Sequence, residues 1–255
     1  MRKRTTVAVF TASVAAAAAV GLAAPAAQAD GYGDTAITKV VVNGGKPVVI
    51  GTTAAKTFTV SVTATDDSGI KGLSSFGVSG PEFGFAQPSS PVTCAQVDAA
   101  TSTCSAAFTM DPRADFYDNS PAGTWYVNAW ADANDGDFYS SEKVGSFKVQ
   151  RYSKLTANAS PEPVRKGKPI TVTGTLTRAD WRTHAYVGHK DQPVQLQFRK
   201  KGTDTYTTVK TVTSTTGGAL KTTVTAAADG YWRYSYAGMS TTAPSKAAGD
   251  FVDVQ

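Results

Sequence analysis

Histidine and cysteine are scarce in this chain, and their scarcity limits the chemistry it can perform. Its 255 residues include two histidines and two cysteines. The signatures G-x-S-x-G, H-E-x-x-H and the phosphate-binding loop are all missing. His184 and His189 share one polar segment, and zinc would need a third ligand there, such as Asp180 or Asp191. Two solvated loop histidines are the preferred interpretation, and we expect no enzymatic activity.

Long hydrophobic runs are missing as well, except at the N-terminus. A basic start at Met1–Arg4 precedes an Ala-rich apolar run, which ends in the A-x-A sequence of residues 27–29. This pattern is typical of a cleaved secretory signal peptide over residues 1–29. No later run approaches the 18 or so apolar residues that span a bilayer. The sequence therefore predicts a secreted, extracellular protein without a membrane span.

The cysteine pair agrees with export. Cys94 and Cys104 flank the segment "AQVDAATST", which has the composition of a hairpin end. In an oxidising compartment an even number of cysteines favours a disulfide, here between neighbouring strands. A redox-active pair is the alternative, but the C-x-x-C spacing of such pairs is absent.

Charge of opposite sign separates the two halves of the chain. Residues 30–150 hold 7 Lys/Arg and 13 Asp/Glu, a net charge of −6, whereas residues 151–255 hold 15 and 7, a net charge of +8. A shift of this size near residue 150 predicts two domains, 30–150 and 151–255, with no long linker between them. Nucleic acid is an improbable partner for an exported protein that has no stacking motif.

Both halves alternate apolar and polar residues with a period of two. Examples are "TFTVSVTATDD" and "TWYVNAWAD" in the first half, and "PITVTGTLTR" and "PVQLQFRKK" in the second. This period is typical of half-buried strands, and turn residues recur every 8–12 positions. The pattern predicts an all-β fold, with about seven strands in each half arranged as a sandwich or barrel.

These segments carry a resemblance to a known architecture. "VSVTATDDSGIKGLSSFGV" and "GTWYVNAWADANDGDFYSSEKVGSFKV" resemble the B–C strands and the F–G hairpin of a bacterial immunoglobulin-like domain. "VRKGKPITVTGTLTR" and "DGYWRYSYAG" resemble the tandem immunoglobulin-like modules of exported bacterial proteins, some of them described as calcium-binding or uncharacterised. The resemblance covers most of residues 35–255 and implies two immunoglobulin-like antiparallel β-sandwiches in tandem. It says little about function, because this architecture hosts many functions.

The implied fold brings two acidic loops of the first half to one end of the sandwich. The loops contain six acceptor residues: Asp66, Asp67, Asp132, Asn134, Asp135 and Asp137. The N-terminal approach, with Asp30 and Asp34, is a further candidate for this end. Clustered carboxylates repel one another, and Ca²⁺, which prefers hard oxygen ligands, would relieve the repulsion. A polar hairpin turn with solvated acids is the alternative interpretation.

Aromatic and basic residues suggest a second kind of binding. Tyr126 and Trp130 share one strand face, while Trp181 and Tyr186 flank the histidines, and exposed rings of this kind suit sugars. They can equally belong to a sandwich core, as can the aromatics of "YWRYSY". Basic clusters at 165–168 and 199–201 fit anionic cell-wall polymers or solvated strand ends. We expect a non-catalytic binding or structural protein, with calcium in the first domain; the alternative is a carbohydrate or cell-wall polymer binding module.

Overall fold

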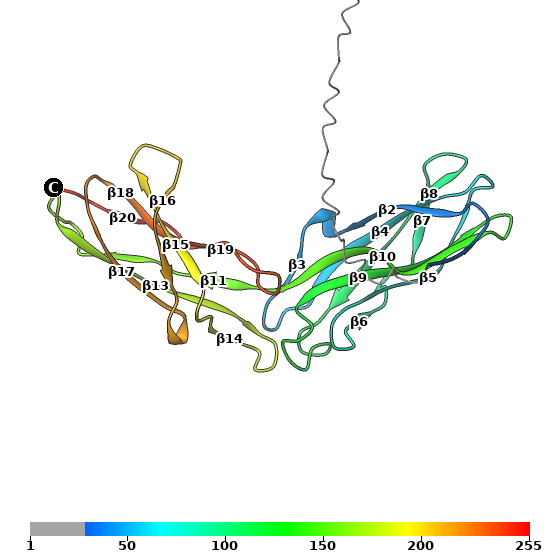
Figure 1. Cartoon of the computed structure of the whole chain (residues 1–255), viewed down its shortest axis with the longest axis horizontal. Helices are drawn as coiled ribbons and strands as arrows, with labels where there is room; N and C mark the ends of the chain where they lie inside the picture. The colour runs from blue at the N-terminus through cyan, green and yellow to red at the C-terminus, as the bar shows by residue number, and fades with distance from the viewer. Residues whose placement is uncertain (1–28) are drawn as a thin grey trace, which may run out of the picture.

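The computed structural model describes residues 29–255, and its regular structure is β-strand apart from two short 3-10 turns, η1 (Asn43–Gly45) and η2 (Thr216–Gly218). The predicted signal peptide lies outside the described residues, except for Ala29. No helix in the described part of the chain has the length and apolar character needed to cross a bilayer. Two β-lobes lie side by side along the long axis (Figure 1).

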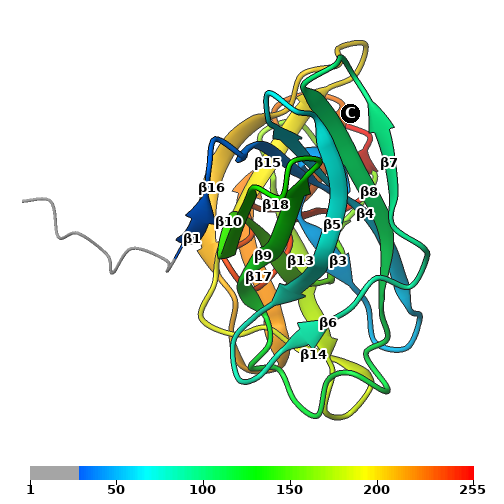
Figure 2. The same ribbon diagram turned by 90° about the vertical axis from the view of Figure 1, so that its right-hand side faces the viewer.

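The first lobe is a sandwich of two sheets, as the alternating sequence predicted. One sheet has the order β1 (Ala29–Tyr32), β10 (Phe138–Arg151), β9 (Gly123–Ala133), β5 (Ile70–Ser79) and β6 (Phe85–Ala86), and β3 (Val48–Ile50) pairs in parallel with β10. The other has the order β2 (Ala36–Val42), β4 (Lys56–Thr65), β8 (Thr101–Met110) and β7 (Thr93–Gln96). The two sheets face each other across the core (Figure 2).

Strand order identifies this sandwich as immunoglobulin-like. The seven strands of an immunoglobulin-like sandwich are lettered A to G in chain order, and here they correspond to β2, β4, β5, β7, β8, β9 and β10. One sheet then has the order A-B-E-D, and the other contains C, F and G. That is the constant-type arrangement. The core consists of the inward residues of each strand, such as Val60, Phe108, Trp125 and Val127, all at most 1% exposed. Period-two patterning thus placed the apolar face of each strand correctly.

The second lobe is built from ten strands, β11 to β20. Its first sheet contains β11 (Ser153–Leu155), β12 (Asn158–Ser160), β13 (Pro169–Asp180), β14 (Ala185–Gly188) and β17 (Ala219–Thr225). Its second contains β15 (Pro193–Lys200), β16 (Thr207–Thr213), β18 (Gly230–Tyr236), β19 (Ser245–Lys246) and β20 (Asp250–Val252). Trp232, Tyr234 and Tyr236 face its interior and are at most 4% exposed. These three aromatics of "YWRYSY" are therefore core residues, whereas Tyr231 lies on the other face of the strand and is half-buried.

The predicted disulfide is confirmed. Cys94 on β7 and Cys104 on β8 are directly paired in the register, and their sulfurs are bonded. It fastens β7, an edge strand whose four residues are all exposed, to the buried strand β8.

A tryptophan from the second half completes the core of the first sandwich. Trp181 follows β13, is fully buried, and stacks on Phe116 with ring centroids 4.4 Å apart. Its indole Nε1 donates to the carbonyl of Gly51 at 2.9 Å, and its backbone N–H donates to Asn119 Oδ1 at 2.9 Å. The expectation that Trp181 is exposed for ligand binding is therefore wrong, because its ring is packed into the core of the first sandwich.

Candidate functional site

The two acidic loops of the first sandwich meet at one end, as the fold resemblance implied. The β4–β5 loop spans residues 66–69 and the β9–β10 loop spans residues 134–137. The backbone N–H of Asn134 donates to the carbonyl of Gly69 at 3.0 Å, and the Asn134 amide donates to the carbonyl of Ser68 at 2.9 Å. The backbone N–H of Asp135 lies 3.3 Å from the Ser68 hydroxyl. These bonds hold the loops in contact.

Five carboxylates converge there in two overlapping groups. Ligand oxygens of Asp34, Asp66 and Asp67 lie within 4.8 Å of one another, as do those of Asp66, Asp135 and Asp137. Asp66 belongs to both groups and is only 2% exposed. The site therefore has a buried central acid with exposed or half-buried acids on either side.

The N-terminal segment supplies one of these acids. The turn after β1 brings the backbone N–H of Asp34 to 3.3 Å from Asp137 Oδ2. Gly33 makes this approach possible: its φ is +79°, and a Cβ there would lie 1.4 Å from Asp137 Oδ2. Sequence reasoning named Asp34 only as a further candidate, because its place depends on how β1 pairs with β10. Asp30 lies instead on β1, beside Ser140.

The pKa values of Asp34 and Asp66 are shifted in opposite directions. Partial desolvation, followed by the charges of Asp67 and Asp66, raises the pKa of Asp34. Burial also raises the pKa of Asp66, but hydrogen bonds from Ser68 and Thr35 outweigh it and hold the pKa below its usual value. Ser68 Oγ donates to Asp66 Oδ1 and Thr35 Oγ1 to Asp66 Oδ2, both at 2.6 Å. Asp66 is thus held ionised in a buried position.

One of the six predicted ligands has a different place. Asp132 belongs to neither acidic group, because its side chain leaves β9 on the outer face while the neighbouring Ala131 and Ala133 face the core. The prediction that Asp132 joins the cluster is wrong. Asn134 lies in the loop as predicted, and its amide nitrogen donates to the Ser68 carbonyl. Asp66, Asp67, Asp135 and Asp137 are brought together as expected.

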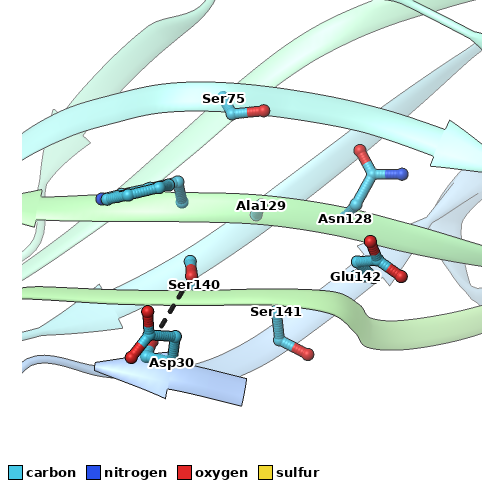
Figure 3. Close-up of a pocket in the computed structure, with 8 residues that line it drawn as sticks. Asp30, Ser75, Asn128, Ala129, Ser140, Ser141 and Glu142 are labelled. Carbon is cyan, nitrogen blue, oxygen red and sulfur yellow. Dashed lines mark hydrogen bonds between the residues drawn. The ribbon is translucent and has the colours of Figure 1, made fainter. Parts of the chain in front are cut away.

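A second candidate region lies on the outer face of the β1-β10-β9-β5-β6 sheet. A hollow of about 300 Å³ is lined by Asp30, Ser75, Asn128, Ala129, Trp130, Ser140, Ser141 and Glu142 (Figure 3). Trp130 is 38% exposed and stacks on Phe138, with ring centroids 5.0 Å apart. The Asn128 and Glu142 side chains lie beside each other on neighbouring strands in this view (Figure 3). The hollow combines an exposed indole with amide, hydroxyl and carboxylate groups.

Irregular pairing shapes this hollow. The β9–β10 register shifts between Ser141 and Gly145, and the β5–β9 register shifts between Leu73 and Ser75. Such shifts bend a strand and re-aim its side chains, here near Glu142 and Ser75. A single sequence gives little signal for them.

The other predicted ring residues have separate places. Tyr126 lies on the same face of β9 as Trp130, and its ring is covered by Lys143 Nζ at 4.8 Å. Tyr186 is half-buried near the junction of the lobes, where Lys154 Nζ lies 3.6 Å from its ring centroid. The structure therefore divides the four predicted ring residues between the sheet face and the junction.

The two histidines differ from the prediction of two solvated residues. His184 is exposed, but His189 is 4% exposed and its Nε2 lies 3.2 Å from the Tyr236 hydroxyl. Burial, followed by the charges of Arg178 and Arg151, lowers the pKa of His189 to about 4. The solvated interpretation is correct for His184 and wrong for His189, because the segment directly after β14 stays against β13, where the His189 N–H donates to the Leu176 carbonyl at 2.9 Å.

Comparisons with known proteins give likeness of shape only. No family model and no curated protein matches the chain. Among solved structures, a chimeric titin Z1Z2 has a TM-score of 0.26 and 14% identity, over 90% of this chain and 98% of that one. The D00–D0 domain of intimin has a TM-score of 0.29 and 15% identity, over 84% and 99%. The adhesin InvE of Yersinia pseudotuberculosis has a TM-score of 0.29 and 12% identity, over 84% and 58%. Since these TM-scores lie under 0.5, the immunoglobulin-like assignment rests on the strand order of the chain itself.

Proposed function

We propose that this protein is an exported, non-catalytic binding protein that holds Ca²⁺ at the loop end of its first sandwich. The N-terminal sequence pattern and the disulfide support export. The observation that carries the calcium proposal is the sharing of Asp66 by two groups of carboxylates, each with ligand oxygens within 4.8 Å. The proposed ligands are Asp34, Asp66, Asp67, Asp135 and Asp137.

The chemistry of the donors favours calcium over other cations. All five groups are carboxylates, and Ca²⁺ takes six to eight oxygen ligands at about 2.3–2.6 Å in flexible geometry. Loops from three parts of the chain can adjust to such a shell more readily than to the strict octahedron of Mg²⁺. A divalent cation would also offset the repulsion that raises the pKa of Asp34. Calcium would therefore fasten the N-terminal segment and both loops together.

Thermal denaturation with calcium or a chelator tests this proposal. Because Ca²⁺ would bind only the folded loops, the melting temperature should rise with calcium concentration once it exceeds the dissociation constant. Replacing Asp135→Asn together with Asp137→Asn should remove the calcium-dependent part of the rise. The control is Asp132→Asn, which removes a carboxylate from the same hairpin outside the cluster and should leave the rise intact. If millimolar calcium leaves the melting temperature unchanged, or if magnesium raises it equally, the calcium proposal is contradicted. The acidic loops would then form a polar turn with solvated carboxylates.

Carbohydrate or cell-wall polymer binding is the second candidate function, and the exposed Trp130 beside a polar hollow favours it. An indole face can stack on the apolar face of a sugar while Asn128, Glu142 and Asp30 bond its hydroxyls. The basic second lobe would add attraction for anionic polymers.

Binding to purified cell-wall polysaccharides, followed by tryptophan fluorescence, tests this candidate. Trp130→Ala should weaken retention at least tenfold. Tyr117→Ala is the matched control, because Tyr117 is 93% exposed and lies outside the hollow. Equal retention of both variants would exclude the sheet face as the binding surface.

A further inference from the structure

Two arginines, one buried and one half-buried, lie close together where the lobes meet. Arg151 ends β10 and is 6% exposed, while Arg178 is half-buried on β13. The positive charges of both arginines lower the pKa of His189, in the same direction as burial. They also act to lower the pKa of Tyr236, against the larger effect of burial, which raises it. Burial, then the charge of Arg178, lowers the pKa of Arg151 to about 10. These four side chains form one neighbourhood, which we call the junction cluster.

The guanidinium groups of the junction cluster have no acidic partner among residues 29–255. The ion pairs in that part of the chain are Lys190–Asp191 and Lys201–Asp229, and both lie at the surface. The Nε atoms of Arg151 and Arg178 are buried and have no hydrogen-bond acceptor among the described residues. Asp180 is near enough to act on both pKa values, but its Oδ1 accepts the backbone N–H groups of residues 182 and 183, at 3.0 Å each.

Two buried hydroxyls beside the cluster also have no partner in the described chain. Thr242 is fully buried and pairs with Arg151 in a parallel bridge, and Ser245 is paired with Tyr236 in the register of β18 and β19. The hydroxyl oxygens of both are buried without a hydrogen bond. Gln150, the neighbour of Arg151 in the chain, points to the opposite face of the strand. Its Nε2 donates to the Met239 carbonyl at 2.7 Å, and its Oε1 is a buried acceptor that receives no hydrogen bond from either arginine.

The cluster therefore holds an excess of donors and of positive charge. A guanidinium stays protonated at every physiological pH, so burial cannot be relieved by losing the proton. A buried, uncompensated charge is strongly destabilising, and buried donors are almost always satisfied. Arg151 Nε, Arg178 Nε and the Thr242 and Ser245 hydroxyls all require an acceptor. Ser153, the register partner of Arg178, donates its hydroxyl to the Ala243 carbonyl at 2.7 Å and accepts no hydrogen bond from Arg178 Nε.

We propose that the junction cluster binds one small inorganic anion of halide size, held by Arg151, Arg178 and the hydroxyls of Thr242 and Ser245. A halide offers acceptor capacity in every direction and neutralises one of the two charges. A small anion is proposed because the Nε atoms of both arginines and the hydroxyls of Thr242 and Ser245 are all buried. The anion would link the end of β10, which leaves the first lobe, to residues of the second lobe. It would thereby stabilise the junction between the lobes.

Thermal denaturation of the full exported chain in chloride against gluconate, at equal ionic strength and with chelator, tests this inference. Gluconate is too large for the site. The melting temperature should rise saturably with chloride, by roughly 3–6 °C at tenfold excess over the dissociation constant. The chloride-dependent rise should vanish in Arg178→Gln. It should persist in Arg182→Gln, which removes an exposed guanidinium two residues after β13.

A measurement on the wild-type protein covers the case in which Arg178→Gln does not fold. Bound chloride should broaden the ³⁵Cl magnetic resonance line, bromide should reverse the broadening, and Thr242→Val should weaken it. The inference is overturned if the wild-type protein gives no broadening, or if chloride and gluconate stabilise it equally. Water would then be the only partner of the buried donors.

Discussion

At the scale of single residues, the matched pair of histidines gives a prediction about pH. The folded pKa of His189 is about 4, below the ordinary value of 6.5, so the folded state resists protonation. Stability from this group is present above pH 6.5 and is lost as pH falls from 6.5 toward 4. We expect the free energy of unfolding to fall by up to about 3 kcal/mol across that window because of His189 alone.

Urea denaturation at pH 7, 5 and 4 measures this loss. His189→Gln removes the titrating group and should flatten the dependence between pH 6.5 and pH 4, leaving the part due to carboxylates. His184→Gln is the control, because His184 is exposed and its replacement should leave the wild-type slope. Identical pH profiles for the two variants would mean that His189 becomes protonated in the folded state without penalty.

At the scale of elements, the disulfide is predicted to act locally. It joins residues ten apart, so the chain-entropy relation limits its contribution to about 3 kcal/mol. Replacing both cysteines by alanine should lower the melting temperature by at most roughly 10 °C. β7 pairs only with β8 at the edge of its sheet. Hydrogen exchange should therefore accelerate in β7 and stay unchanged in β9 and β10; loss of protection throughout the first lobe would contradict this.

The strands, and the loops that meet at one end of the first sandwich, could be predicted from the sequence, because both depend on local patterns. Alternation of apolar residues decides which face of a strand is buried, and the immunoglobulin-like order brings the β4–β5 and β9–β10 loops together. The sequence therefore predicted correctly that Asp66 and Asp135 lie at the same end of the sandwich. Asp132 was misplaced because the turn begins two residues later than the sequence indicated, which leaves it on the strand's outer face.

Residues whose place depends on contacts between distant elements could not be predicted. Asp34 reaches the cluster only because β1 pairs with the start of β10. Trp181 and His189 sit in a polar segment whose composition is typical of an exposed loop, yet both are buried by neighbours far away in the chain. A single sequence contains no periodic signal for such contacts.

At the scale of the whole molecule, β10 connects the two ends of the first sandwich. It begins at Phe138, beside the acidic loops, and ends at Arg151, where the lobes meet. The backbone of that last residue is bonded to the 239–245 segment: Arg151 N–H donates to the Thr241 carbonyl at 3.0 Å, and Ala243 N–H donates to the Arg151 carbonyl at 3.0 Å. The proposed calcium site and the proposed anion site therefore lie at opposite ends of one continuous strand.

The charge break at residue 150 predicted two separate domains, and the packing of Trp181 bears on how independent they are. Its ring belongs to the core of the first lobe, while its backbone continues β13 of the second. A chain ending at residue 150 would leave Phe116 and the Gly51 carbonyl without this partner. We therefore expect residues 30–150 alone to be less stable than the same residues in the full chain.

Trp181→Ala in the full chain tests this coupling directly. Removing a fully buried Trp typically costs 3–5 kcal/mol, and here the cavity would open in the core of the first lobe, at the point where the second half of the chain enters it. We expect the melting temperature to fall and small-angle scattering to show a broader range of angles between the lobes. Trp130→Ala, which removes a partly exposed indole from the outer sheet face, should lower stability much less and leave the scattering unchanged. If Trp181→Ala melts at the wild-type temperature with unchanged scattering, the lobes are independent domains.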